Sequence, residues 1–294
     1  MDAFRVVVRR GGVVEAEHAV HAVAVRDGEI VAAAGDPRLV TLLRSSAKPL
    51  QALPLARAYQ DIDARELAIA SASHLAQPMH LEAVRMLLRR ARCDEDDLEC
   101  GPEGTPPARI KHNCSGKHAG MLAVCRAHGW RTEGYRLPGH RMQRQNLEDV
   151  ARAAGAAKDD IRTATDGCGV VTFALPLDRM ARMFASLTSS SEGQRVADAM
   201  RAHPEYIRGE GATDTVLMQS IPGAAAKGGA EGLICGFLPD GAGFALKTAD
   251  GSHRALRAAL AAFLPGLGHE LPEFAATPFR NSRGEVVGEI VLAG

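Results

Sequence analysis

Short runs of apolar residues separated by turn residues mark both ends of the chain. Near the N-terminus, two β-branched runs flank a Gly-Gly turn in RVVVRRGGVV, and the next pair flanks Asp27-Gly28, a dipeptide typical of tight hairpins. The C-terminal segment ATPFRNSRGEVVGEIVLAG has a similar turn near Ser282-Arg283-Gly284. Hairpins at both ends predict that the two termini meet in one antiparallel sheet.

The middle of the chain has apolar residues at three- and four-residue spacing, which places them on one face of a helix. Examples are DARELAIASAS, MHLEAVRMLLRRARC and GHRMQRQNLEDVARAAG, the last of which ends at a glycine typical of helix C-termini. Strand-like runs return in GLICGFLP and GFALKTADG, followed by the helical segment HRALRAALAAFLPGL. This order predicts an α/β or α+β fold with helices packed on one sheet. Since no linker or repeat interrupts the chain, we expect residues 1–294 to form one domain with a helical subregion at about 50–210.

Composition narrows the class of protein. The chain has 294 residues, 46% of them apolar, so it can bury a substantial core. Its formal net charge is zero and aromatic residues are few, which argues against a nucleic-acid-binding surface. No apolar run approaches the ~18 residues of a membrane helix, and the N-terminus lacks a secretory pattern. We therefore expect a cytoplasmic protein that binds neither nucleic acid nor membranes.

The six cysteines are irregularly spaced and include no CxxC pair. In a long cytoplasmic chain, this pattern favours free thiols or metal ligands over a disulfide framework. A structural four-cysteine zinc site has no support in the spacing. The cysteines are Cys93, Cys100, Cys114, Cys125, Cys168 and Cys235.

The segment RSSAKPLQALP places a hydroxyl and an amine three residues apart, at Ser45 and Lys48. Pro49 is tolerated in the first turn of a helix, so a helix should begin near Ser45 and carry both side chains on one face. A lysine acts as a base near neutral pH only if burial or a neighbouring cation lowers its pKa from about 10.4. The pair is consistent with a serine nucleophile and its base, but the four-residue pattern alone favours a plain serine cap. Pro54 predicts a kink after the first turn of this helix.

Two further segments carry candidate chemistry. FALKTADG places Lys247-Thr248 on a strand, as in the Lys-Thr-Gly strand of serine β-lactamases and penicillin-binding proteins, although Ala249 replaces the glycine. An exposed strand lysine would give the same pattern.

The segment KHNCSGKHAGML sets Cys114 and Lys117 at a loop-to-helix junction, where thiol pKa values fall and anions bind. A second thiol, Cys168, follows Asp166 in a glycine-rich turn. Two thiolates and a carboxylate could hold zinc with an open position. Buried cysteines that serve only packing remain the alternative.

Taken together, these segments resemble the rhizobial-type, thermolabile L-asparaginases of the asparaginase II family. The resemblance extends over nearly the whole chain, and HNCSGKHAG followed by DGCG is its most specific part. The matching segments are GDP at 35–37, RSSAKPLQALP at 44–54, ASHLAQPMHLEAV at 72–84, HNCSGKHAGML at 112–122, DGCGVVTFALPL at 166–177, GATDTVLM at 211–218 and AKGGAEG at 226–232.

The resemblance implies a fold like that of serine β-lactamases and glutaminases, a homodimer, and hydrolysis of L-asparagine to L-aspartate and ammonia. It also implies two Ser-Lys pairs, which we assign to Ser45 with Lys48 and Ser73 with Lys247. A zinc ion (Zn2+) would be held by three residues, and two more would contact the substrate. The implied ligands are Cys114, Lys117 and Cys168, and the implied substrate contacts are His118 and Asp166.

The chain departs from the family pattern in two places. Where the family usually has Ser-His-Ser-Gly-Glu, this chain has Ser73 to Gln77 with Leu75 and Ala76 in place of a serine and a glycine. The segment at 101–111 is also shorter than expected by about one helix. These departures leave two alternatives: a serine amidohydrolase of different amide specificity, and a catalytically silent relative.

Overall fold

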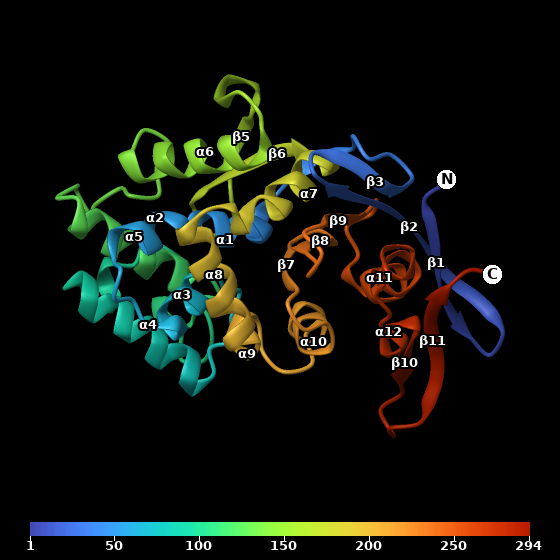
Figure 1. Ribbon diagram of the computed structural model, residues 1–294. Helices are drawn as coiled ribbons and strands as arrows, with labels where there is room; N and C mark the ends of the chain where they lie inside the picture. Colours follow the sequence, from blue (N-terminus) through green and yellow to red (C-terminus); the bar gives the residue numbers. More distant parts are fainter.

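The larger of the two sheets in the molecule is antiparallel and has eight strands (Figure 1). The computed structural model describes residues 1–294. The strand order is β10-β11-β1-β2-β9-β8-β7, and β3 pairs with β2 beside this path. The strands are β1 (Phe4–Arg10), β2 (Val13–Arg26), β3 (Glu29–Ala34), β7 (Ala225–Gly229), β8 (Leu233–Phe237), β9 (Gly243–Thr248), β10 (Ala276–Arg280) and β11 (Val286–Leu292).

The two chain ends meet in this sheet, which confirms the prediction from the terminal hairpins. Strand β1 pairs with β11, with Val6 opposite Leu292. Asp27 and Gly28 join β2 to β3 with φ angles of 51° and 85°. Two consecutive positive φ angles are the requirement of the tight hairpin turn that Asp-Gly favours. The mixed α/β architecture with an antiparallel sheet from both termini is therefore established.

The helical part of the chain covers one face of the sheet and extends beyond it (Figure 1). The break expected at Pro54 is present, because α1 ends at Gln51 and α2 begins at Leu53. Helix α6 stops at Gly155, whose φ of 59° is the left-handed conformation typical of helix C-caps. The helices of this part are α1 (Lys48–Gln51), α2 (Leu53–Ala58), α3 (Ala64–Ala70), α4 (Pro78–Ala91), α5 (Ser115–Ala127), α6 (Arg141–Ala154), α7 (Leu177–Ala185), α8 (Ser191–Ala202), α9 (Pro204–Ile207) and α10 (Thr213–Ser220).

Two hydrophobic cores lie on opposite faces of the sheet. Alternation along β2 sends Val23 and Val25 to the larger core, which lies under the helical part, and sends Ala22 and Ala24 to the smaller one. The smaller core is covered by α11 (Leu256–Phe263) and α12 (Pro272–Ala275), which lie against the red and dark-blue strands in Figure 1, and Leu217 of α10 also packs into it. Because both faces are covered, the central strands read as nearly continuous apolar runs.

A second, three-stranded sheet has the order β4-β6-β5 and lies within the helical part. The sequence pattern identified this region only as a glycine-rich turn before an apolar run. The strands are short, and β4 pairs with β6 across more than a hundred residues of chain, which no local pattern reveals. Its strands are β4 (Val40–Leu42), β5 (Arg162–Thr165) and β6 (Val171–Pro176).

The short segment at 101–111 forms a tight exposed loop closed by a bridge between Glu103 and Ala108, followed by a 3-10 turn. Among the helices, none has both the length and the apolar character that crossing a bilayer requires.

Candidate active site

The turn that carries Ser45 is held in place by the small sheet. It is a 3-10 turn over Arg44–Ala47 that leads directly into α1. Strand β6 fixes its start, since Leu43 N donates to Phe173 O at 2.8 Å and Arg44 N donates to Thr172 Oγ1 at 3.0 Å. Arg44 adopts a positive φ of 48°, a strained conformation that costs about 1–3 kcal/mol for a residue other than glycine. The next residue, Ser45, is half-buried at the tip of this constrained turn.

Lys48 closes the same turn and is completely buried. Its Nζ donates to Ala72 O at 2.5 Å and lies 2.9 Å from Ser73 Oγ. Burial lowers the pKa of the Lys48 amine below its usual value; the Cys114 thiol opposes this effect and Lys117 reinforces it. The direction of this shift meets the condition for a lysine base. The hydroxyl bonded to the amine is Ser73, and no hydrogen bond joins Lys48 to Ser45.

Ser73 is positioned by the loop after α3, which is tied to two other parts of the chain. Its backbone N–H donates to Ile207 O at 2.8 Å. His74 Nε2 is 2.8 Å from Ser115 Oγ, and burial lowers the pKa of His74 to about 3, so the ring is neutral. Leu75 points away from this cluster and is 59% exposed. The serine that touches the buried amine is therefore Ser73, and Leu75 lies at the surface beside Gly209.

Two thiols and an amine converge next to Lys48. Cys114 precedes α5, Lys117 lies in its first turn, and Lys117 Nζ is 3.0 Å from Cys168 Sγ. A hydrogen bond from Cys168 lowers the pKa of Cys114, and with the charges of Lys48 and Lys117 it outweighs the effect of burial. The same contact and burial raise the pKa of Cys168. The structure thus brings together the three residues that the family resemblance implies as zinc ligands.

This donor set fits zinc, with one condition. Thiolate sulfur and neutral amine nitrogen are soft enough ligands, and three protein ligands leave a fourth position open. Burial lowers the pKa of Lys117, but Cys168, Cys114 and Asp166 outweigh it and raise the pKa above its usual value. The amine must therefore release a proton when metal binds. No group of three or more His, Cys, Asp or Glu side chains is placed to hold a metal, so a zinc site here depends on Lys117.

The two predicted substrate contacts border this cluster. His118 is fully buried; its Nδ1 is 2.6 Å from the Tyr135 hydroxyl, and its Nε2 has no hydrogen-bond partner. Burial lowers the pKa of His118 well below its usual value. Asp166 accepts from Arg44 Nε at 2.5 Å, so its carboxylate anchors the residue before Ser45. The Asp166 carboxylate thus already accepts a hydrogen bond from Arg44, whereas His118 Nε2 is available to a ligand.

Lys247 is not brought to Ser73. It lies on β9, opposite His21 on β2 and Leu233 on β8, and its amine donates to the carbonyl of Thr248. Burial lowers the pKa of Lys247, and the charges of Glu231 and Asp250 oppose this shift. Strand β9 is in the interior of the sheet, two strands from the edge that faces the Ser45 turn. The structure shows no contact between Ser73 and the Lys247 that we predicted as its partner. The sequence could not reveal this, because the pattern of a strand lysine does not indicate which strand is the edge.

The lysine that does face the Ser45 turn is Lys227, on the edge strand β7. It is fully buried, its carbonyl accepts from Ser46 Oγ at 2.9 Å, and its Nζ donates to Gly228 O at 2.6 Å. Burial lowers the pKa of Lys227 well below its usual value; Asp214 opposes the shift and Lys48 adds to it. Sequence reasoning used AKGGAEG only as a mark of the family. A lysine followed by two glycines was the available signal, since small residues allow another segment to approach a strand closely.

A model of the family described as L-asparaginase II matches residues 6–292 of the chain. The chain belongs to the L-asparaginase II family, a family of amidohydrolases. No curated protein matches this family member.

Several solved structures are similar to this L-asparaginase II family member at low sequence identity. Mglu in its native form is 16% identical, with a TM-score of 0.48, over 89% of this chain and 66% of that one. EstCE1, a hydrolase with promiscuous acyltransferase activity, is 12% identical, with a TM-score of 0.44, over 78% of this chain and 88% of that one. A β-lactamase from Mycobacterium bovis is 14% identical, with a TM-score of 0.35, over 79% and 88% of the two chains. The family member spans less than two thirds of the length of Mglu.

Proposed function

We propose that this chain is an L-asparaginase that hydrolyses L-asparagine to L-aspartate and ammonia through an acyl-enzyme on Ser45. The observation that carries the proposal is the buried Lys48 amine, hydrogen-bonded to Ser73 and closing the constrained turn that begins beside Ser45. Membership of the L-asparaginase II family supports the choice of substrate.

In the first half of the reaction, the neutral Lys48 amine takes the Ser45 hydroxyl proton as Ser45 Oγ bonds to the side-chain amide carbon of the substrate. The carbon–nitrogen bond then breaks, and the leaving ammonia receives the proton from Lys48, directly or through the Ser73 hydroxyl 2.9 Å away. This step leaves an aspartyl ester on Ser45.

In the second half, water attacks the ester and gives a proton to Lys48. The ester bond breaks, L-aspartate leaves, and Lys48 returns the proton to Ser45 Oγ. Burial favours the neutral form of Lys48 as the free base, and before metal binds the charge of Lys117 adds to this effect. We assign to the burial of Lys48 and to the charge of Lys117 the electrostatic role that the sequence led us to expect of Lys247.

We further propose that Cys114, Lys117 and Cys168 hold a zinc ion. When bound, zinc would act as a Lewis acid that orients a polar group of the substrate. His118, with its unpartnered Nε2 beside this cluster, would contact the substrate carboxylate. The expectations of a homodimer and a cytoplasmic location stay proposals that rest on the family resemblance. Light scattering of the purified chain tests the first.

The test is ammonia release from L-asparagine by the purified chain and its Ser45→Ala variant. Thr41→Ala is the matched control, because it removes a hydroxyl from β4, outside the turn. Ser45→Ala should lose activity on the order of a thousandfold or more, while Thr41→Ala should match the wild type. Added hydroxylamine should divert turnover to the aspartyl hydroxamate, since it competes with water for an acyl-enzyme. Full activity in Ser45→Ala would refute the assignment.

A related amidase specificity is the second candidate, and Leu75 is the observation that favours it. Leu75, at the position where the family resemblance implies a serine, is exposed and lies against Gly209. A panel of L-asparagine, L-glutamine and larger amides separates the two functions by their kcat/KM ratios.

A further inference from the structure

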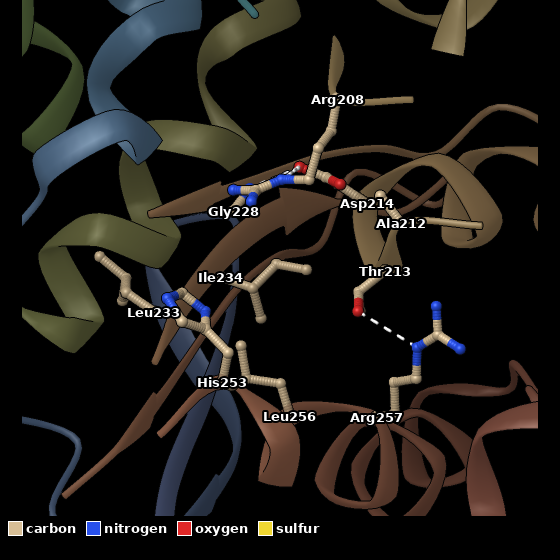
Figure 2. Close-up of a pocket in the computed structure, with 10 residues that line it drawn as sticks. All are labelled: Arg208, Ala212, Thr213, Asp214, Gly228, Leu233, Ile234, His253, Leu256 and Arg257. Carbon is tan, nitrogen blue, oxygen red and sulfur yellow. Dashed lines mark hydrogen bonds and ion pairs between the residues drawn. The ribbon is translucent and has the colours of Figure 1, made fainter. Parts of the chain in front are cut away.

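A cavity of about 200 Å³ lies beside Gly228, near the end of β7 (Figure 2). It is bounded by the N-terminal ends of α10 and α11, and no step of the proposed reaction uses it. Its floor is apolar and its rim is charged. The residues that line it are Arg208, Ala212, Thr213, Asp214, Gly228, Leu233, Ile234, His253, Leu256 and Arg257.

Two guanidinium groups at this cavity have nitrogen atoms without partners. Arg257 is held by three contacts: Nε donates to Thr213 Oγ1 at 3.3 Å, Nη2 donates to Gly211 O, and the group stacks 4.9 Å from the Phe274 ring centroid. Its Nη1 forms no hydrogen bond within the chain. Arg208 has only a long ion pair, 3.8 Å from Nε to Asp214 Oδ2. Figure 2 shows Arg257 reaching Thr213 from one side and Arg208 extending over Gly228 from the other.

The helix α10 adds positive potential to the same cavity. It begins at Thr213, and no side chain caps its N-terminus. The free N–H groups of a helix start favour an anion, and two arginines with spare donors favour a carboxylate in particular.

The buried carboxylate at the cavity, Asp214, has an oxygen atom without a hydrogen-bond donor. Asp214 is 2% exposed; its Oδ2 accepts from Gly228 N at 3.0 Å, but its Oδ1 has no hydrogen-bond partner. An unsatisfied buried acceptor of this kind costs about 1–3 kcal/mol. A ligand that supplied a donor toward Asp214 and an acceptor toward Arg257 would complete both groups. The floor formed by Ile234 and Leu256 would accept a small apolar side chain.

We propose that this cavity binds a small apolar α-amino acid as its zwitterion, with the carboxylate at Arg257 and the ammonium group toward Asp214. Asp214 Oδ2 also lies 3.6 Å from Lys227 Nζ. Occupancy would therefore act on the lysine that faces the Ser45 turn and couple this cavity to the proposed active site. The binding itself does not depend on the proposed function.

The test uses isothermal titration with L-valine, which has no side-chain amide to hydrolyse. Isovalerate, which lacks the ammonium group, and isobutylamine, which lacks the carboxylate, serve as matched probes. We expect one L-valine to bind per chain with a dissociation constant of about 1 mM or below. Each analogue should bind at least about tenfold more weakly. Arg257→Gln should weaken L-valine binding by a similar factor, whereas Arg257→Lys should restore part of it.

Two control variants make the result decisive. Arg283→Gln removes an exposed hairpin arginine far along the sheet and should leave binding unchanged. Ser45→Ala should also bind L-valine normally, because Ser45 does not line this cavity. The proposal is overturned if L-valine does not bind at about 10 mM, if Arg257→Gln binds it as the wild type does, or if isovalerate binds equally well.

Discussion

Gly229 is the point at which the edge strand β7 touches the turn that carries Ser45, and its replacement by alanine tests that packing. A Cβ atom at this position would lie 2.8 Å from Ser46 Oγ and 2.9 Å from Leu43 O. Ordinary contacts of such an atom begin at 3.4 Å. The Leu43 carbonyl, which is backbone, would therefore have to retreat by roughly half an ångström.

The expected consequence is larger for activity than for stability. Overpacking of this kind costs about 1–3 kcal/mol of unfolding free energy. Displacement of a reacting group by about 1 Å can lower the rate by about a hundredfold. A shift of about half an ångström at Ser45 should therefore lower kcat by about tenfold. The assays are urea unfolding and ammonia release from L-asparagine.

Two variants complete this experiment. Gly266→Ala is the matched control, because nothing lies within 4 Å of the added atom. Adding Ser46→Ala to Gly229→Ala removes the 2.8 Å contact but not the one with Leu43 O, so it should restore only part of the activity. If Gly229→Ala kept the stability and kcat of the wild type, the close packing of β7 on the Ser45 turn would be wrong.

Three other changes have defined outcomes. Lys48→Met should lower kcat at least about a hundredfold with far-ultraviolet circular dichroism unchanged, because it removes the proposed base but keeps an apolar chain in its place; residual activity near the wild-type level would contradict this. The folded-state pKa of His74, about 3, lies below its unfolded value, so stability should fall as the pH drops from about 6.5, by about 2 kcal/mol at pH 5. His74→Asn should lose that part of the pH dependence in urea titrations, and equal slopes in both proteins would argue against a buried neutral ring. Elemental analysis should find about one zinc per chain, lost in Cys114→Ala and in Cys168→Ala; zinc that survives both substitutions would lie elsewhere.

Local patterns were sufficient for most of the fold. The turn residues Asp27 and Gly28 require positive φ angles, and the glycine after α6 does the same, so hairpin and helix end follow from single residues. The break before Pro54 follows from ring geometry in the same way. By contrast, β4 and β6 pair over a long sequence separation, and nothing within either segment encodes the partner.

In the candidate site, too, the features that depend on long-range contacts could not be predicted from local patterns. The convergence of Cys114, Lys117 and Cys168 was anticipated from the family resemblance, since spacing alone could not join a helix start to a distant turn. The choice between Lys247 and Lys227 required the strand order. Both are strand lysines; the two glycines after Lys227 were a hint, and the position of β7 at the sheet edge decides between them.

The pairing of β2 with β9 has a consequence for how the molecule reaches its native state. Val20 lies opposite Thr248, so the centre of the sheet joins segments more than two hundred residues apart. Such high contact order slows folding, because the entropy of closing the long loop is lost before the strand contacts form. During synthesis, the first hairpin must wait for β9 with its apolar edge exposed, while the intervening helices can already fold. Refolding from denaturant should accordingly show early helix formation and a slower phase in which the sheet closes.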